Sequence, residues 1–300
     1  MNIRAIRYVR AGLVMAGLLG MSQSGLGQGP DFSQVEIQTT RHSNNFFTLD
    51  GQGGRIGALV GPDGVFLVDT QFAPLTEKIV AAVAEISDAP IRFAVNTHVH
   101  GDHTGGNANL AKLGVTLMAR DQLRQRLAAT TGDNAPPAEA LATVTYDGPV
   151  TLHMNGETIH LIPILSAHTD GDTLIYFENN DALMAGDYFR TNGYPNIDLN
   201  NGGSLNGMLA GLGETLGMTG PNTKVIPGHG AITDRNGLQA HRDMMLGVRD
   251  RVAQLVAQGM TIEQVIAAKP TSAFDSQTAN AEGSSERFIR QLFSELGGGQ

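Results

Sequence analysis

Four side chains that commonly bind metal ions fall within six residues of this chain, at His98, His100, Asp102 and His103. The pattern His-x-His-x-Asp-His contains three of the nine histidines in the sequence. It follows the β-branched, apolar run Ile91–Val95, which predicts a buried strand. Because side chains along a strand repeat with a period of two, we expect His98 and His100 to point to the same side.

Gly101 lies inside this motif and allows the backbone to bend sharply after the second histidine. We therefore expect Asp102 and His103 to face a second point, beside the one that His98 and His100 face. One cluster of this kind supplies half of the ligands of a two-metal site. The alternative is a polar turn whose histidines are satisfied by other groups, although four clustered ligands leave little for such a turn to explain.

The length of 300 residues fits one large α/β domain, and no stretch of the sequence resembles a linker between independent domains. We predict a single domain over residues 28–300, with a core of about 35–258 and C-terminal helices over 259–300. The chain contains no cysteine, which excludes disulfides and a thiolate nucleophile or ligand. Any metal must therefore be held by histidine and carboxylate side chains.

The N-terminus has the composition of a secretory signal peptide. Arg4, Arg7 and Arg10 precede an apolar run over residues 11–21, which is short for a membrane span, and small residues follow. We predict a signal peptide over residues 1–27 and a periplasmic or secreted protein. The alternatives are an uncleaved anchor or an ordinary apolar helix. Cleavage of this signal peptide would remove three arginines and make the net charge of −9 more negative. An acidic protein is a poor partner for nucleic acid and anionic membranes.

Strands dominate the first part of each half of the chain, and helices close each half. This order fits two sheets packed face to face with helices outside. The predicted strands are 35–39, 46–49, 56–60, 65–69, 91–95, 115–118, 150–154, 157–165, 173–177, 182–185 and 224–226. The predicted helices are 74–86, 121–129, 204–216, 236–258, 261–268 and 286–296.

Three further ligand candidates, His168, Asp187 and His229, each lie in a glycine-containing turn just past a predicted strand. Ligand sites at strand ends are typical of open sheet folds. Taken singly, each is more often a polar loop residue, but together with the upstream motif they make a joint site the sharper interpretation. The remaining histidines lack such settings, and we expect them at the surface or in packing: His42, His153, His160 and His241.

The order of the seven candidate ligands along the chain resembles that of the metallo-β-lactamase superfamily over about residues 35–258. They are His98, His100, Asp102, His103, His168, Asp187 and His229. The resemblance implies an α+β fold, an αββα sandwich of two mixed β-sheets flanked by helices, with the site at one edge of the sheets. It also implies one metal on His98, His100 and His168, and a second on Asp102, His103 and His229. Asp187 would bridge the two metals, and Asp69 matches an acidic position that is usually structural or supports a ligand.

The ligand types separate this chain from some members of that family. Lactamases of the commonest zinc classes have cysteine at the position of Asp187 and lack a histidine at the position of His103. A third lactamase class has the Asp-His pair but usually lacks the bridging aspartate. Glyoxalase-II-like thioesterases and acyl-homoserine lactonases share both features, so β-lactam hydrolysis is possible but is not favoured. Flavodiiron-type relatives have glutamate at the position of His100, which argues against a redox role.

The resemblance implies a hydrolase in which two divalent metals, by default Zn²⁺ with iron or manganese as alternatives, activate a water for attack on a carbonyl. Asp102 would orient the resulting hydroxide and move its proton. The other ring nitrogens of the five histidines need acceptors, for which Asp69 and Asp172 are candidates. The hairpin over residues 46–56 and the loop over 189–204 are expected to frame a small-molecule substrate. Tyr188, Phe189 and Tyr194 are candidates for contacting that substrate, with core packing as the alternative.

Two other functions fit the same residues. One is a metal-dependent phosphodiesterase or nuclease, which the acidic balance and the absence of a basic patch disfavour. The other is a non-catalytic metal-binding protein, which a complete ligand set disfavours. The sequence leaves open the acyl group of the substrate, the metal in vivo and the oligomeric state.

Overall fold

The first sheet of the fold has seven strands in the order β1 to β7, each hydrogen-bonded to the next along the chain. This computed structural model describes residues 31–298. Strands β1 to β4 are antiparallel neighbours, whereas β4, β5, β6 and β7 run parallel. Their bounds are β1 Gln38–Arg41, β2 Phe46–Asp50, β3 Ile56–Leu59, β4 Val65–Val68, β5 Ile91–Val95, β6 Thr116–Arg120 and β7 Val144–Tyr146.

The second sheet has five strands in the order β12-β11-β10-β9-β8. All its pairs are antiparallel except β11 with β12, so both sheets are mixed. The strands are β8 Val150–Met154, β9 Glu157–Pro163, β10 Thr173–Phe177, β11 Ala182–Met184 and β12 Lys224–Ile226. The helices are α1 Thr76–Ala84, α2 Gly101–Thr104, α3 Asn107–Lys112, α4 Asp121–Ala129, α5 Leu205–Met218, α6 Arg235–Ala257, α7 Ile262–Ala267 and α8 Ala281–Glu295.

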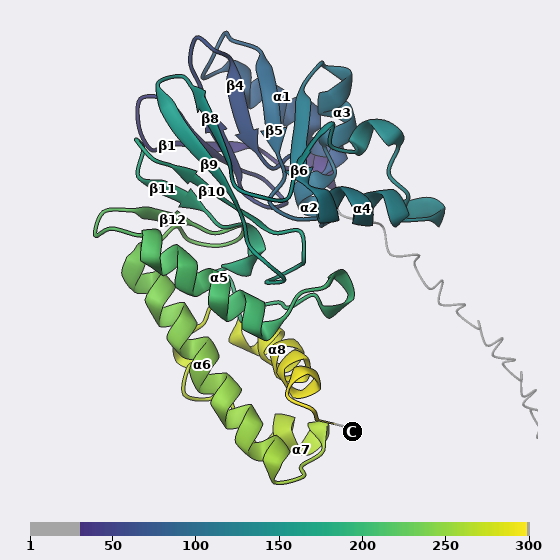
Figure 1. Ribbon diagram of the computed structural model, residues 1–300, viewed down its shortest axis with the longest axis vertical. Coiled ribbons are helices and arrows are strands. Elements are labelled where there is room, and N and C mark those ends of the chain that lie inside the picture. The colour runs from purple at the N-terminus through teal and green to yellow at the C-terminus, as the bar shows by residue number, and fades with distance from the viewer. Residues whose placement is uncertain (1–30, 299–300) are drawn as a thin grey trace, which may run out of the picture. The chain divides into compact units, whose positions relative to one another are not determined.

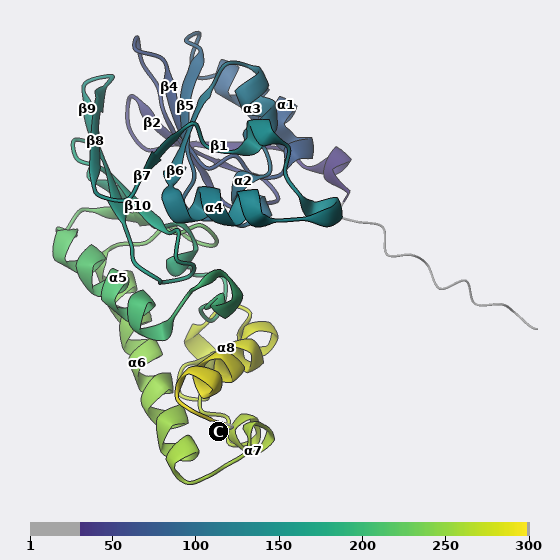
Figure 2. The same ribbon diagram turned by 45° about the vertical axis from the view of Figure 1, so that its right-hand side comes forward.

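Alternation along the strands produces a four-layer sandwich (Figure 1). In β4, Phe66 and Val68 face the second sheet and contribute to an apolar cluster that includes Ile175 and Phe177 of β10. Their neighbour Leu67 faces the other way, into the cluster under α1. On the outer face of the second sheet, a third cluster joins β10, β11 and β12 to α5, α6 and α8, and Figure 2 shows these helices on that side. The predicted αββα sandwich of two mixed sheets is confirmed.

Most predicted elements are present, with shifted ends. The first strand is Gln38–Arg41 rather than 35–39, and its four residues are all exposed, so no apolar pattern marks it. A three-residue strand, Val144–Tyr146, was not predicted because only Tyr146 is buried. The last helix begins at Ala281 rather than at residue 286. The predicted signal peptide lies outside the described residues. Within residues 31–298, no helix has both the length and the apolar character needed to cross a membrane.

Candidate metal centre

The seven predicted ligands lie in loops and short helical turns that follow strands of the two sheets. β5 ends at Val95, and the His-x-His-x-Asp-His motif forms the turn after it and the short helix α2, with His100 as the residue before that helix. His98 and His100 do face one common point, as expected, but strand alternation is not the cause, because neither residue belongs to β5. Instead, Asp69 accepts hydrogen bonds from the backbone N and the hydroxyl of Thr97 and draws the chain out of the sheet.

The remaining ligands follow strands of the second sheet, each within a few residues of the strand's end. His168 follows β9, Asp187 follows β11 and His229 follows β12. These three strands run in the same direction, because β9 and β11 are both antiparallel to β10 and β12 is parallel to β11. Their carboxyl ends therefore meet at one edge, as expected for a ligand site in a sheet fold.

His98, His100 and His168 form what we call the first donor set, whose three ligand atoms lie within 4.8 Å of one another. Each ring has one nitrogen occupied by a hydrogen-bond acceptor. His168 Nδ1 lies 2.6 Å from the carbonyl oxygen of Asn196, and His100 Nε2 lies 2.7 Å from Asp198 Oδ2. Thr97 donates its hydroxyl hydrogen to Asp69, so its oxygen is left to accept from His98 Nδ1 at 3.0 Å.

In a neutral ring, each of these acceptors takes the one N–H hydrogen and leaves a lone pair on the other nitrogen. The lone-pair nitrogens of His100 and His168, Nδ1 and Nε2, lie only 3.0 Å apart and cannot hydrogen-bond without an added proton. His98 Nε2 is buried and has no hydrogen-bond partner among the described residues. Three converging lone pairs fit a cation at their centre, and imidazole nitrogens are common ligands of Zn²⁺ and similar ions.

Asp102, His103 and His229 form the second donor set, whose ligand atoms also lie within 4.8 Å of one another. His103 Nδ1 lies 2.7 Å from Asp69 Oδ2, so its Nε2 faces the set, 3.4 Å from His229 Nε2. His229 Nε2 lies 3.1 Å from Asp102 Oδ2. Two nitrogens and one carboxylate oxygen again suit a divalent metal of the zinc type.

Asp187 lies between the two donor sets. One carboxylate oxygen lies 3.4 Å from His103 Nε2 and the other lies 3.4 Å from His229 Nε2. Asp187 also groups with His98 and His103 as a potential metal-binding trio. Its Oδ1 is buried and forms no hydrogen bond among the described residues, so the ion pair with His103 at 3.4 Å is what compensates its charge. The residues present therefore fit a pair of metal ions that share this carboxylate.

The electrostatics of the site favour cations. Burial lowers the pKa of His98 well below its usual value, and nearby histidines add to the effect; burial also lowers the pKa of His168 to about 4. Both rings therefore stay neutral and free to bind metal. Burial raises the pKa of Asp187, but the charges of the surrounding histidines, His103 first, outweigh it and hold that pKa well below the usual value. The bridging position is thus a carboxylate at neutral pH.

A family model for the metallo-beta-lactamase superfamily matches residues 50–239. The chain belongs to the metallo-beta-lactamase superfamily. A hydroxyacylglutathione hydrolase from Polaromonas is 31% identical over 162 residues, which cover 52% of this chain and 55% of that protein. The chain therefore spans little more than half the length of this curated relative.

Two solved structures share the fold. A metallo-β-lactamase from Pontibacter korlensis matches with a TM-score of 0.61 and 17% identity, covering 70% of this chain and 99% of that one. A stereoselective inverting sec-alkylsulfatase from Pseudomonas matches with a TM-score of 0.70 and 17% identity, covering 88% of this chain and 51% of the sulfatase chain. At these identities, the likeness concerns the architecture alone.

Of the four acceptors that hydrogen-bond the imidazole rings of the two donor sets, the sequence predicted Asp69 and missed Thr97, Asn196 and Asp198. Asp69 is buried and contacts His103, as its place ahead of the motif suggested. Asp172 instead accepts from the backbone N of His168 and Thr169 and from the Thr169 hydroxyl, and it contacts no ring nitrogen. It fixes the loop, not the imidazole. Asn196 and Asp198 supply acceptors for His168 and His100, but nothing in their spacing relates them to those residues.

The aromatic candidates for substrate contact belong to the core instead. Tyr188, Phe189 and Tyr194 are each at most 1% exposed. The hydroxyl of Tyr188 lies 2.7 Å from Thr215 Oγ1, and that of Tyr194 donates to Asp275 Oδ1 at 2.7 Å while its ring stacks on Phe288. The expectation that Tyr188 and Tyr194 contact substrate is therefore wrong, because the C-terminal helices cover the loop that carries them.

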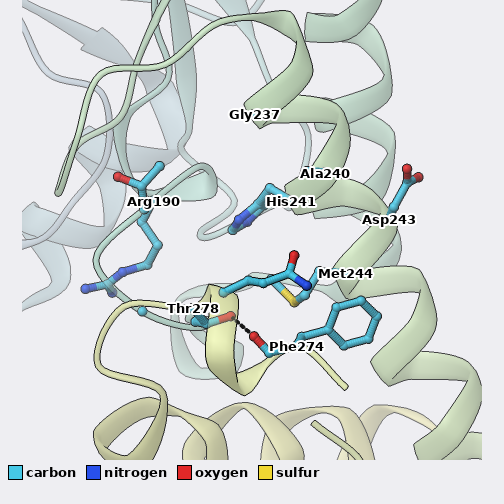
Figure 3. Close-up of a pocket in the computed structure, with 11 residues that line it drawn as sticks. Arg190, Gly237, Ala240, His241, Asp243, Met244, Phe274 and Thr278 are labelled. Carbon is cyan, nitrogen blue, oxygen red and sulfur yellow. Dashed lines mark hydrogen bonds between the residues drawn. The ribbon is translucent and has the colours of Figure 1, made fainter. Parts of the chain in front are cut away.

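His241 occupies a separate pocket, between α6 and the segment after Asp187 (Figure 3). Its ring packs edge-on against Phe189, and burial, with Arg190 adding to it, lowers its pKa to about 4. Its Nε2 has no partner among the described residues. It joins none of the three potential metal-binding groups found in that part of the chain, in agreement with its predicted packing role.

The hairpin between β2 and β3 ties the second donor set to the first sheet. The backbone N of Gly54 donates to the carbonyl of Asp102 at 3.0 Å, and that of Arg55 donates to the carbonyl of Gly228, next to His229, at 2.8 Å. A Cβ placed on Gly54 would overlap the His103 ring. The predicted hairpin thus lies directly against the centre, and glycine is required where it approaches the imidazole.

Proposed function

We propose that this chain is an exported hydrolase that uses two divalent metal ions to cleave the carbonyl bond of a small ester, thioester, lactone or β-lactam. The observation that carries the proposal is the convergence of two three-ligand sets on one shared carboxylate, with lone-pair nitrogens of His100 and His168 3.0 Å apart. Such an arrangement stores a large unfavourable interaction unless cations occupy it.

Two such ions, when bound, would lower the pKa of a water towards neutrality and polarise a carbonyl oxygen. Asp102 supports the hydrolysis from this chain's side. Its side chain is 26% exposed, against 7% for Asp187, so it can exchange a proton with solvent. Burial raises the pKa of Asp102, but the hydrogen bond with His229 and the charge of His103 bring it below the usual value. The carboxylate is therefore ionised, and its oxygen that does not face His229 can take a proton.

Zinc is the default metal for these ligands, and iron or manganese suits an aspartate-bridged pair as well. Thioesters are the first substrates to test. Asp187 and His103 give this chain the ligand types of glyoxalase-II-like hydrolases, and a curated relative carries the name hydroxyacylglutathione hydrolase. The net charge of −9 supports a small-molecule substrate over nucleic acid.

The test loads purified residues 28–300 with zinc and measures metal content together with turnover of a thioester, a lactone, a β-lactam and a phosphodiester. We expect two equivalents of zinc and turnover of at least one carbonyl substrate. His229→Ala should lose the second equivalent and most of the activity, whereas His241→Ala, the matched control, should keep both. Turnover of the phosphodiester alone would favour the nuclease alternative, and two bound metals with no turnover would favour a binding protein.

Export rests on the predicted signal peptide over residues 1–27. Expression of the full chain in a Gram-negative host, followed by mass spectrometry of the periplasmic protein, tests it. We expect a mature N-terminus near residue 28. A protein that keeps Arg4 to Arg10 and stays in the cytoplasm or membrane would contradict export but not the hydrolase.

A further inference from the structure

A cavity of about 680 Å³ adjoins the metal centre on the side of α4. This volume lies in the range of roughly 300–1,000 Å³ that holds small molecules. Two residues of the metal-binding motif, His100 and Gly101, form part of its wall. Because His100 also contributes a ligand atom to the first donor set, the cavity begins where a substrate carbonyl would lie under the proposed function.

Most of the remaining wall is apolar. It comes from the motif turn and α3, from α4, and from the loop that follows α4. The apolar contributors are Val99, Gly105, Ala108, Leu127, Pro136, Pro137 and Ala140. A substrate group that enters this cavity therefore exchanges water for aliphatic surface, which is favourable only for an apolar group.

The polar side chains in the wall already have partners within the protein. Arg126 holds both oxygens of Asp170 at 2.6 Å, so its charge is neutralised. Thr104 donates to the carbonyl of His100, and Thr130 donates to the carbonyl of Arg126. Asn201 donates to Asp198 Oδ2 at 2.7 Å, the same oxygen that accepts from His100. No cation here is left to receive a carboxylate or a phosphate.

We propose that this cavity is the acyl pocket of the enzyme and takes an unbranched, uncharged aliphatic acyl chain, placing its carbonyl beside His100. The assignment rests on the proposed function and narrows its substrate class. A short hydroxylated acyl group would leave most of the cavity unfilled and its apolar wall in contact with water. Leu127, on α4 and half-buried, sets the depth of the pocket.

The test uses the N-acetylcysteamine thioesters of acetic, butyric and octanoic acid with the zinc-loaded protein, and follows release of thiol. Each CH₂ that leaves water contributes a factor of about four. Allowing for incomplete burial, we expect kcat/KM for the octanoyl ester to exceed that for the acetyl ester at least about tenfold. Leu127→Trp should reduce this octanoyl-to-acetyl ratio to about one. Leu127→Ala should raise kcat/KM for acyl chains longer than octanoyl.

Leu113→Trp is the matched control. Leu113 is 63% exposed and lines a different cavity, between α1 and the start of β5, so this variant should keep the wild-type ratio. A second readout avoids turnover: octanamide should bind the metal-free protein in calorimetry, more weakly to Leu127→Trp and equally well to Leu113→Trp. Circular dichroism and thermal unfolding of each variant show that it is folded.

The outcomes separate this assignment from the function it rests on. Hydrolysis of all three thioesters at similar kcat/KM, unchanged by Leu127→Trp, would overturn the acyl pocket and leave the hydrolase intact. Octanamide binding that Leu127→Trp does not weaken would likewise overturn the pocket. A lack of turnover of every thioester by protein with two zinc ions would overturn the thioester as substrate and with it this assignment.

Discussion

Asp198 Oδ2 lies 2.7 Å from Nε2 of His100, although the two residues are 98 positions apart in the chain. The carboxylate comes from the loop before α5, and the imidazole comes from the motif after β5. This contact orients the ring so that Nδ1 faces His98 and His168. The loop over residues 189–204, expected to frame the substrate, thus supports the first donor set as well.

Asp198→Asn should weaken metal binding at the first donor set about 10–100-fold, because the amide presents a donor where His100 needs an acceptor. Competition titration with a zinc chelator measures the affinity. Asp250→Asn is the control, since Asp250 is an exposed residue paired with Arg249. An unchanged zinc affinity in Asp198→Asn would show that the orientation of His100 does not depend on this contact.

Gly54→Ala should displace His103 and cost one equivalent of zinc or at least about tenfold in its affinity. The added Cβ would overlap the imidazole ring, and overpacking of this kind typically costs about 1–3 kcal/mol. Metal analysis after dialysis gives the stoichiometry. Gly148→Ala serves as the control, because a Cβ at that position meets nothing within 4 Å. Two full equivalents in Gly54→Ala would contradict the close approach.

Tyr188→Phe should lower the free energy of unfolding by about 1 kcal/mol and leave KM for substrate unchanged. The hydroxyl that is lost forms a hydrogen bond with Thr215 of α5, in the core. Urea unfolding and steady-state kinetics measure the two effects. A large rise in KM with unchanged stability would restore Tyr188 as a substrate-contacting residue.

Stability should fall on acidification in a way that depends on His241. Burial, followed by the charge of Arg190, lowers its pKa to about 4 in the folded chain, against about 6.5 when unfolded. As pH falls from 7 to 5, the unfolded chain takes up a proton that the folded chain refuses, so stability is lost. Wild type should lose about 1–2 kcal/mol more than His241→Gln in urea unfolding over this range.

His153→Gln is the control for this measurement, because His153 is exposed on β8. It should follow the wild-type pH dependence. Equal losses in wild type and His241→Gln would show that this ring titrates normally in the folded protein.

Runs of apolar residues predicted the strands whose side chains are buried on both faces, because such burial requires apolar side chains at successive positions. β10 and β12, with mostly buried side chains, were placed at their observed ends. The same reasoning misplaced β1, because Gln38–Arg41 pairs with β2 through its backbone while its side chains are exposed. Hydrogen bonding between backbones leaves no trace in side-chain hydrophobicity.

The sequence by itself determined which residues could bind metal and that they follow strands, since the seven ligands carry their chemistry in their side chains and their position in the chain. Only the tertiary structure decided which nitrogen of each imidazole faces the centre, through Asp69, Asn196 and Asp198. It also decided that Tyr188 and Tyr194 pack in the core while Leu127 lines a cavity beside His100. The reason is that local patterns report burial along one element, whereas these relationships form between loops of two sheets and the C-terminal helices.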